Sequence, residues 1–326
     1  MKYFSIIGII LFIWLLSGID ISKTIQILSG VNLYYISISI CVLLVTIYVR
    51  ALKWRTIVNF FSKGYTTRQA LVTYTIGVAF GAFTPGKAGD LIKVVDLKKV
   101  AGIDSKHGIS ISIFDKIADV IVLMSITLSC SILIALKFST GLNNNLIIGI
   151  LVLIMAGIIF SLTRYAKYVF GPFFKILPEK LGGKIMNLYS YFSGVIEIIK
   201  KDKERFFKFI FLTFLSWMLI FFTPYIFTKA LHLEVPFLYF MIFIPVVFFV
   251  DALPISVLGV GSRDYALIYL FGLLNMTKEA MVSVSLLILL IGNIPFVALG
   301  FFFAWKNKYS LNIGSKDKDK AEKAEV

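Results

Sequence analysis

The stretch ALVTYTIGVAFGAFTPGKAGDLIKVVDL, residues 70–97, decides the fold, because it interrupts an apolar run long enough to cross a bilayer. The interruption falls at Thr84-Pro85-Gly86, where proline removes a backbone donor and glycine loosens a helix. Unpaired backbone at membrane depth persists only inside protein or beside a water-filled cavity. The stretch therefore predicts a broken or re-entrant helix that borders the polar interior of a membrane protein.

The composition supports this prediction. Of 326 residues, 59% are hydrophobic and 16% are charged, and the mean hydropathy is +0.90. Soluble domains contain about 45–50% apolar residues. The net charge of +15 lies in short loops between apolar runs, where it sets orientation and meets anionic headgroups, so we expect no nucleic-acid partner. The chain is predicted to be an all-α polytopic membrane protein.

Histidines and cysteines give no sign of a metal site or a disulfide framework. His107 and His232 stand apart from each other and from the cysteines, so the usual spacing of zinc ligands is missing. Cys41 and Cys130 fall within apolar runs, where cysteine behaves as a small hydrophobic residue. We expect no metal and no cofactor.

Apolar runs define the predicted transmembrane domain, residues 1–305. The first run is read as a retained span, because no signal-peptide cleavage site follows it. With a second interrupted region at 237–271, the domain should hold about six to eight transmembrane helices, two of its segments being broken or re-entrant. The charged stretch 306–326 is predicted to be a disordered cytoplasmic tail. The six uninterrupted runs are 3–19, 33–52, 109–136, 146–162, 206–231 and 281–305.

Positive charge predicts the orientation in the cell membrane. The loop 53–69 carries four Lys or Arg residues, whereas 20–32 carries only Lys23. The long loop 164–208 carries ten Lys or Arg against four acidic residues. Loops rich in Lys and Arg stay in the cytoplasm, so both loops and both termini are predicted to be cytoplasmic.

The loop 164–208 also contains an amphipathic pattern. Apolar residues recur at helical spacing with polar residues on the other side, which predicts a helix on the cytoplasmic membrane surface. Either a plain interfacial anchor or a lipid-recognition element fits this pattern, and the anchor is favoured. The apolar residues are Ile185, Leu188, Tyr189, Phe192, Val195, Ile196 and Ile199.

The two interrupted regions share a pattern of Pro, Gly, a basic residue and Asp. In this orientation the first enters from the cytoplasm and the second from outside, which predicts two halves of inverted topology, as in transporters. Backbone amides at a helix start attract anions, and nearby cations would add charge. Alternatively, the first group is an ordinary basic loop. The candidate headgroup-binding residues are Pro85, Lys87, Gly89, Asp90, Lys93, Gly259, Gly261, Arg263 and Asp264.

A third charged group opens the span 109–136. Asp115 and Asp119 lie one helical turn apart on the same face, and Lys116 projects from a neighbouring face. This spacing suits a bound cation or proton, or pairing with Lys or Arg of the first broken segment. End-of-helix charges that only meet water explain the same residues equally well.

The end of the span 33–52 carries a Trp and several basic residues. Arg50 and Arg55 flank Lys53 and Trp54. Aromatic and basic residues of this kind anchor helices at the membrane interface. The sequence favours an anchoring belt here.

These three groups, in this order, resemble the flippase-like family named after the transmembrane region of lysylphosphatidylglycerol synthase, which includes archaeal homologues labelled dolichol-phosphate-glucose synthetase. The family's motifs are Pro-x-Arg-x-Gly-Glu, Glu-Arg-x-x-Asp and Gly-x-Gly-x-Arg-Glu. Here Lys87, Asp90, Asp115, Lys116 and Asp264 replace Arg, Glu, Glu, Arg and Glu. The signs of the charges survive, but the bidentate arginine geometry is lost at two of the three groups.

The resemblance implies lipid translocation or lipid handling. In the two-domain synthases this membrane part is joined to a soluble aminoacyltransferase, for which no residues remain here, so we expect no enzyme activity and no catalytic residues. The leading hypothesis is a flippase-like protein for an anionic phospholipid or a polyprenyl-phosphate lipid. The alternatives are a membrane-embedded transferase with a lipid-phosphate donor, and a non-transporting partner of a glycosyltransferase or synthase.

Overall fold

Helices form the regular structure of this protein. The computed structural model describes residues 18–138, 179–253 and 258–307, without the side chains of 85–88 and 179–189. Within these ranges every regular element is a helix, which confirms the predicted all-α membrane fold. The predicted spans 3–19 and 146–162 and the predicted tail beyond residue 307 lie outside the described residues.

Four segments of the described chain are long and apolar enough to cross a membrane, and each coincides, to within a few residues at its ends, with one of the predicted uninterrupted spans or extends it. Many of their large apolar side chains are exposed on the outside of the helix bundle, which suits contact with lipid. The segments are α3 (Leu33–Val58), α6 (Ser105–Lys137), α10 (Lys203–Ala230) and the combined stretch Lys278–Lys306.

The last of these segments is not the single regular helix that the sequence predicted. It consists of α13 (Lys278–Leu287), a π-helical turn η2 (Ile288–Asn293) and α14 (Ile294–Lys306). Pro295 lies at the start of α14 and cannot donate a backbone hydrogen bond to the preceding turn. π-helical turns inside α-helices occur frequently at functional sites.

The first interrupted region is broken where the sequence predicted. Helix α4 (Thr67–Ala82) ends before Thr84, whose backbone is extended, and a 3-10 helix η1 (Pro85–Ile92) leads into α5 (Lys93–Val100). The backbone N–H of Gly89 donates to Thr84 Oγ1 at 2.7 Å. A Cβ atom at Gly89 would collide with the Phe80 carbonyl, so glycine lets η1 fold back against the end of α4.

The second interrupted region is also broken. Helix α11 (Phe237–Ala252) ends well before α12 (Ser262–Gly272) begins. Gly259 and Gly261 in the connection have φ angles of +76° and +91°, a conformation that residues with side chains rarely adopt. The carboxylate of Asp264 accepts a hydrogen bond from Gly261 N at 2.8 Å and so closes the first turn of α12.

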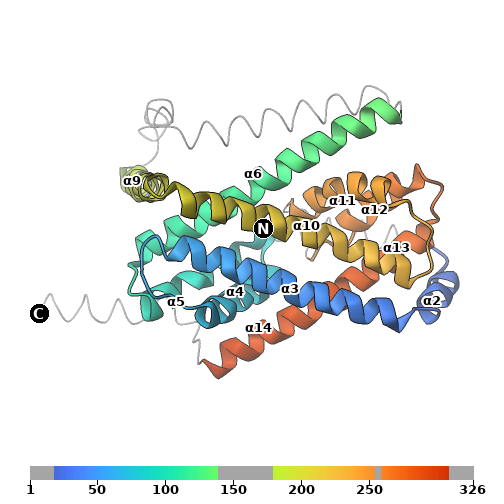
Figure 1. The fold of residues 1–326 in the computed structure, drawn as a ribbon, viewed down its shortest axis with the longest axis horizontal. Coiled ribbons are helices and arrows are strands. Elements are labelled where there is room, and N and C mark those ends of the chain that lie inside the picture. Colours follow the sequence, from blue (N-terminus) through green and yellow to red (C-terminus); the bar gives the residue numbers. More distant parts are fainter. Residues whose placement is uncertain (1–17, 139–178, 254–257, 308–326) are drawn as a thin grey trace, which may run out of the picture.

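The helices form a bundle in which distant parts of the sequence lie together. Figure 1 shows α3 alongside α10, and α14 packs against α4. One hydrophobic core includes α11, α12 and α13, and a second includes α4, α5 and α9; α6 and α10 contribute to both. Each broken segment is therefore packed into its own core.

Two connecting regions differ from the sequence prediction. The predicted loop 20–32 contains a helix, α2 (Ile21–Ser29), which packs against α13. The Asp20 side chain caps the start of α2 by accepting a hydrogen bond from Lys23 N. The predicted helix in the loop 164–208 is confirmed as α9 (Glu179–Lys201). However, Phe192, Val195 and Ile199 pack into the second core and not onto a membrane surface, because α9 lies against α6 and α10.

Candidate functional site

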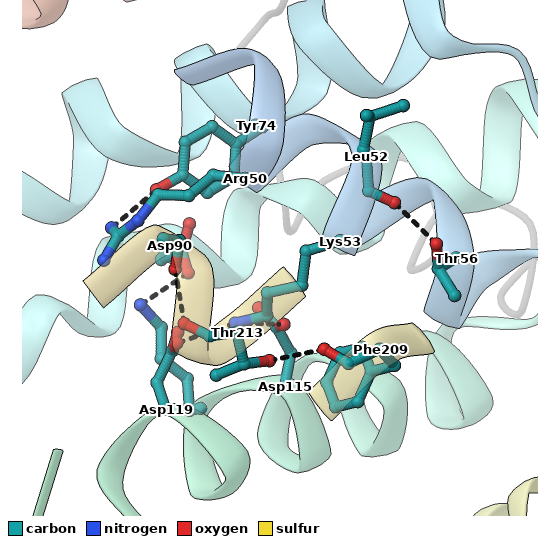
Figure 2. Close-up of polar contacts among 12 residues, drawn as sticks. Arg50, Leu52, Lys53, Thr56, Tyr74, Asp90, Asp115, Asp119, Phe209 and Thr213 are labelled. Atoms are coloured by element: carbon teal, nitrogen blue, oxygen red, sulfur yellow. Dashed lines mark hydrogen bonds and ion pairs between the residues drawn. The ribbon is translucent and has the colours of Figure 1, made fainter. Parts of the chain in front are cut away.

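Lys53 is buried at the centre of the site. Its side chain is only 5% exposed, and Nζ lies 2.9 Å from Asp115 and 2.7 Å from Asp119. Figure 2 shows Lys53 together with these two aspartates. The spacing of the two aspartates, one turn apart on α6, lets both carboxylates face the same lysine. Trp54 is buried as well. The predicted anchoring belt is therefore wrong for these two residues, because α3 packs this end against α6 and α10.

Two further lysines, Lys93 and Lys116, connect the first broken segment to α6. Lys93 Nζ lies 2.8 Å from Asp90 and 3.7 Å from Asp115. Lys116 Nζ lies 2.7 Å from Asp90. Of the alternatives for the third charged group, the structure therefore shows pairing with the first broken segment. Three lysines and three aspartates from α3, η1, α5 and α6 form one cluster, here called the Lys–Asp cluster.

Aromatic rings and a glycine hold Lys93 in this cluster. Its Nζ lies 4.6 Å from the centroid of the Trp54 ring and 5.0 Å from that of Tyr74. A Cβ atom at Gly77 on α4 would collide with the Asp90 carboxylate and would lie 2.5 Å from Lys93 Cε. Gly77 therefore makes room for the Asp90–Lys93 ion pair. A glycine in an apolar helix gave no signal of this role in the sequence.

The second broken segment builds a separate polar group around Arg263. This side chain is 2% exposed. Its Nε donates to Ser285 Oγ at 2.9 Å, and Nη1 donates to the Leu258 carbonyl at 3.1 Å. Asp251 of α11 lies 3.8 Å from Nη1. Asp264 shares the Ser285 hydroxyl by a short hydrogen bond. The predicted site residues Arg263 and Asp264 are thus linked by hydrogen bonds to the same Ser285 hydroxyl of α13.

Sequence reasoning missed Asp251 and Ser285. Asp251 is the one charged residue of α11, and an ionisable residue inside an apolar span is a functional candidate by default. That signal was available. Ser285 gave none, because a serine in an apolar helix usually bonds to its own backbone. Gly259, predicted to bind a headgroup, leaves space for Asp251, since a Cβ atom there would collide with that carboxylate.

The Lys–Asp cluster and the polar residues around Arg263 both line one cavity of about 240 Å³. Predicted site residues on its wall are Asp90, Lys93, Asp115, Lys116, Asp119, Gly259 and Arg263. Asp264 and Gly261 do not line the cavity; the Asp264 carboxylate accepts hydrogen bonds from Ser285 Oγ and from Gly261 N. The side chains of Pro85 and Lys87 are outside the described atoms. The cavity is thus the place where the two broken segments meet.

The cavity wall combines balanced charge with a large apolar surface. Its charged residues are four cations, Arg50, Lys93, Lys116 and Arg263, and four carboxylates, Asp90, Asp115, Asp119 and Asp251. Aromatic side chains of α10, α11 and α14 and the π-helical turn η2 complete the wall. Such a cavity is able to receive a polar group together with an apolar chain.

Comparison with known proteins agrees with this architecture. The UPF0104 membrane protein PH1989 of Pyrococcus horikoshii is 24% identical over 330 residues, covering 93% of this chain and 96% of that protein. No solved structure matches the chain. The family model described as lysylphosphatidylglycerol synthase TM region matches residues 4–300. With nearly its whole length matched, and with both broken segments and their charged residues in place, the chain belongs to the lysylphosphatidylglycerol synthase TM region family.

Proposed function

We propose that this protein takes the headgroup of an anionic lipid into the cavity and lets it pass between the two sides of the membrane. The observation that carries the proposal is that two broken segments from opposite halves of the sequence line one cavity with charged residues on its wall. Broken helices at a shared polar site are the usual construction of transporters. The proposal places the protein in the cell membrane with both termini cytoplasmic.

The charges support a lipid headgroup as the cargo. Ionisable residues inside a span cost about 2.5–3.5 kcal/mol each on insertion scales, so a cluster of them in an apolar bundle calls for a role. Here the Lys–Asp cluster balances its own charge, so its buried ions are compensated within the protein. Its lysines still offer donors to a phosphate that enters beside them.

The cargo class is an anionic phospholipid or a polyprenyl-phosphate lipid. Both combine a phosphate with an apolar chain, and the cavity wall offers cations next to aromatic side chains. The matched region is described as a TM region, and we assign it movement of a lipid and no aminoacyl transfer. The proposed cationic contacts of the lipid phosphate in the cavity are Lys93, Lys116 and Arg263.

The test is reconstitution of the purified protein in liposomes that contain headgroup-labelled lipids of several classes. Wild-type protein should expose the inner-leaflet label to an external quencher faster than empty liposomes do. Lys116→Gln, at the cavity wall, should slow this exposure, whereas Lys23→Gln, at an exposed position of α2, should not. Rates equal to empty liposomes for every lipid class would contradict the proposal. Chemically altered lipid after the incubation would favour the transferase alternative.

A further inference from the structure

Arg50 differs from the other cations on the cavity wall. Its Nη1 donates to the Tyr74 hydroxyl at 2.8 Å, while Nε is buried and has no hydrogen-bond partner among the described residues. No carboxylate of the described chain lies within 4.0 Å of its guanidinium. By contrast, Lys93 and Lys116 pair with Asp90, and Arg263 pairs with Asp251. Among the described residues of the wall, Arg50 alone carries a positive charge without an ion pair.

A second unsatisfied donor lies beside it. The Arg50 guanidinium carbon is 5.4 Å from the centroid of the Trp217 ring, and the indole Nε1 of Trp217 is also buried without a partner in the part of the chain that the structure describes. Both residues line the cavity. Buried donors are nearly always satisfied by protein, water or ligand, so two orphans on one wall indicate an acceptor that binds there.

Arg50 and its two neighbours, Tyr74 and Trp217, come from three different helices. The two aromatic side chains hold the Arg50 guanidinium in place. Arg50 is on α3, Tyr74 on α4 and Trp217 on α10. Figure 2 shows the Arg50 side chain extended toward the Tyr74 hydroxyl. Asp119 and Asp115 attract its charge from beyond ion-pair distance. A guanidinium that is positioned before binding loses little freedom when it meets an oxyanion.

We propose that Arg50, with Trp217 and Tyr74 beside it, forms a binding site for one phosphate oxyanion, here called the seat. The guanidinium fork matches two oxygens of a phosphate, and the indole N–H supplies one more donor. The inference rests on the proposed function for its source of phosphate, a lipid headgroup. Free phosphate shares the same chemistry. Lys53, Lys93, Lys116 and Arg263 then serve as the ion-paired framework around the seat.

Binding in detergent tests the seat. Native mass spectrometry would follow retention of phosphatidylglycerol, with diacylglycerol as the phosphate-free probe and glycerol 3-phosphate as the chain-free probe. Arg50→Gln should weaken retention of phosphatidylglycerol about tenfold or more, because a charge-assisted contact is lost. Trp217→Phe should weaken it by a smaller factor. Arg55→Gln, on the same helix but at an exposed position, is the matched control and should bind like wild type.

The outcomes separate the seat from the transport proposal. Arg50→Gln that is folded and binds phosphatidylglycerol like wild type overturns the seat, whatever the transport rate is. Loss of binding in Arg50→Gln without any wild-type transport supports the seat and contradicts the proposed function. Glycerol 3-phosphate binding that equals lipid binding shifts the source to a free phosphate. If Arg50→Gln does not fold, Arg50→Lys decides, since it keeps the charge but loses the fork; unchanged affinity would contradict the seat.

Discussion

Lys116 of α6 lies 2.7 Å from the carboxylate of Asp90 on η1, and this ion pair ties a membrane-spanning helix to the first broken segment. The two ends of the pair differ in their surroundings. The Lys116 side chain is 40% exposed, whereas that of Asp90 is 8% exposed. The lysine therefore reaches the pair from the cavity, and its partner is fixed in protein. Loss of the lysine and loss of more deeply buried partners should have different consequences.

Lys116→Gln should cost little stability, about 1 kcal/mol or less. Pairs with one exposed partner contribute little, and Asp90 keeps its ion pair with Lys93 at 2.8 Å. Thermal unfolding in detergent, followed by tryptophan fluorescence, measures this. Because Lys116 lines the cavity, lipid exposure in liposomes should nevertheless slow several-fold. A large fall in the unfolding midpoint would show that the pair is structural.

Lys53→Met should be far more destabilising, by about 3–5 kcal/mol, because it leaves two buried carboxylates without their nearest cation. The double variant Lys53→Met with Asp119→Asn should recover part of this loss, since one uncompensated charge disappears. Unfolding in detergent again measures both.

The exposed Lys63→Met is the matched control for Lys53→Met and should unfold like wild type. An equal effect of Lys53→Met and Lys63→Met would show that the Lys53 ion pairs contribute nothing. A double variant less stable than Lys53→Met alone would show that Asp119 is needed for another contact.

Hydropathy was sufficient to predict the four described spans, and the positions of Pro and Gly were sufficient to predict the two breaks. Apolar length marks a crossing, and Pro and Gly mark where a helix ends, so both signals are local. The pairing of Asp115 and Asp119 with a lysine was also foreseeable, because helical spacing alone places them on one face. Which lysine they meet depends on packing between helices, and Lys53 was assigned to the membrane interface instead.

Residues that the sequence misassigned share one property. Arg50 and Lys53 come at the end of the apolar run 33–52, where basic residues usually meet headgroups, but α3 continues to Val58. Only the packing of α3 against α6 and α10 shows that these residues face inward. The π-helical turn η2 was missed for a related reason. Its residues are apolar apart from Asn293, so periodicity does not distinguish them from a regular span.

Gly77→Ala should disturb the Lys–Asp cluster. The added methyl would collide with the Asp90 carboxylate on a tightly packed face of α4. Overpacking of this kind typically costs about 1–3 kcal/mol. Gly194→Ala in α9 is the matched control, because no described atom lies within 4 Å of the place that its methyl group would take. It should be neutral or stabilising by about 0.5–1 kcal/mol, since alanine favours a helix. Equal unfolding midpoints of the two variants would contradict the close approach at Gly77.

Tyr65, in the connection between α3 and α4, gives a prediction about pH. Its hydroxyl lies 3.2 Å from an Asp96 carboxylate oxygen and 2.8 Å from Thr73 Oγ1. Burial raises the pKa of Tyr65 above its ordinary value of 10.0, and the charge of Asp96 adds to the shift. In the unfolded chain the tyrosine loses its proton near pH ~10, while the folded protein keeps it. The stabilisation is therefore complete below that pH and is lost as the pH rises further.

Tyr65→Phe should cost about 1–3 kcal/mol near neutral pH, because a hydrogen bond to a carboxylate is lost. The stability gap between wild type and this variant should then shrink as the pH rises from about 8 to about 11, since only wild type carries the proton difference. Unfolding in detergent over this pH range measures the gap. Tyr34→Phe, at an exposed position, controls for loss of a phenol. A gap that stays constant or widens above pH ~10 would contradict the raised pKa, because the sign of the linkage would then be wrong.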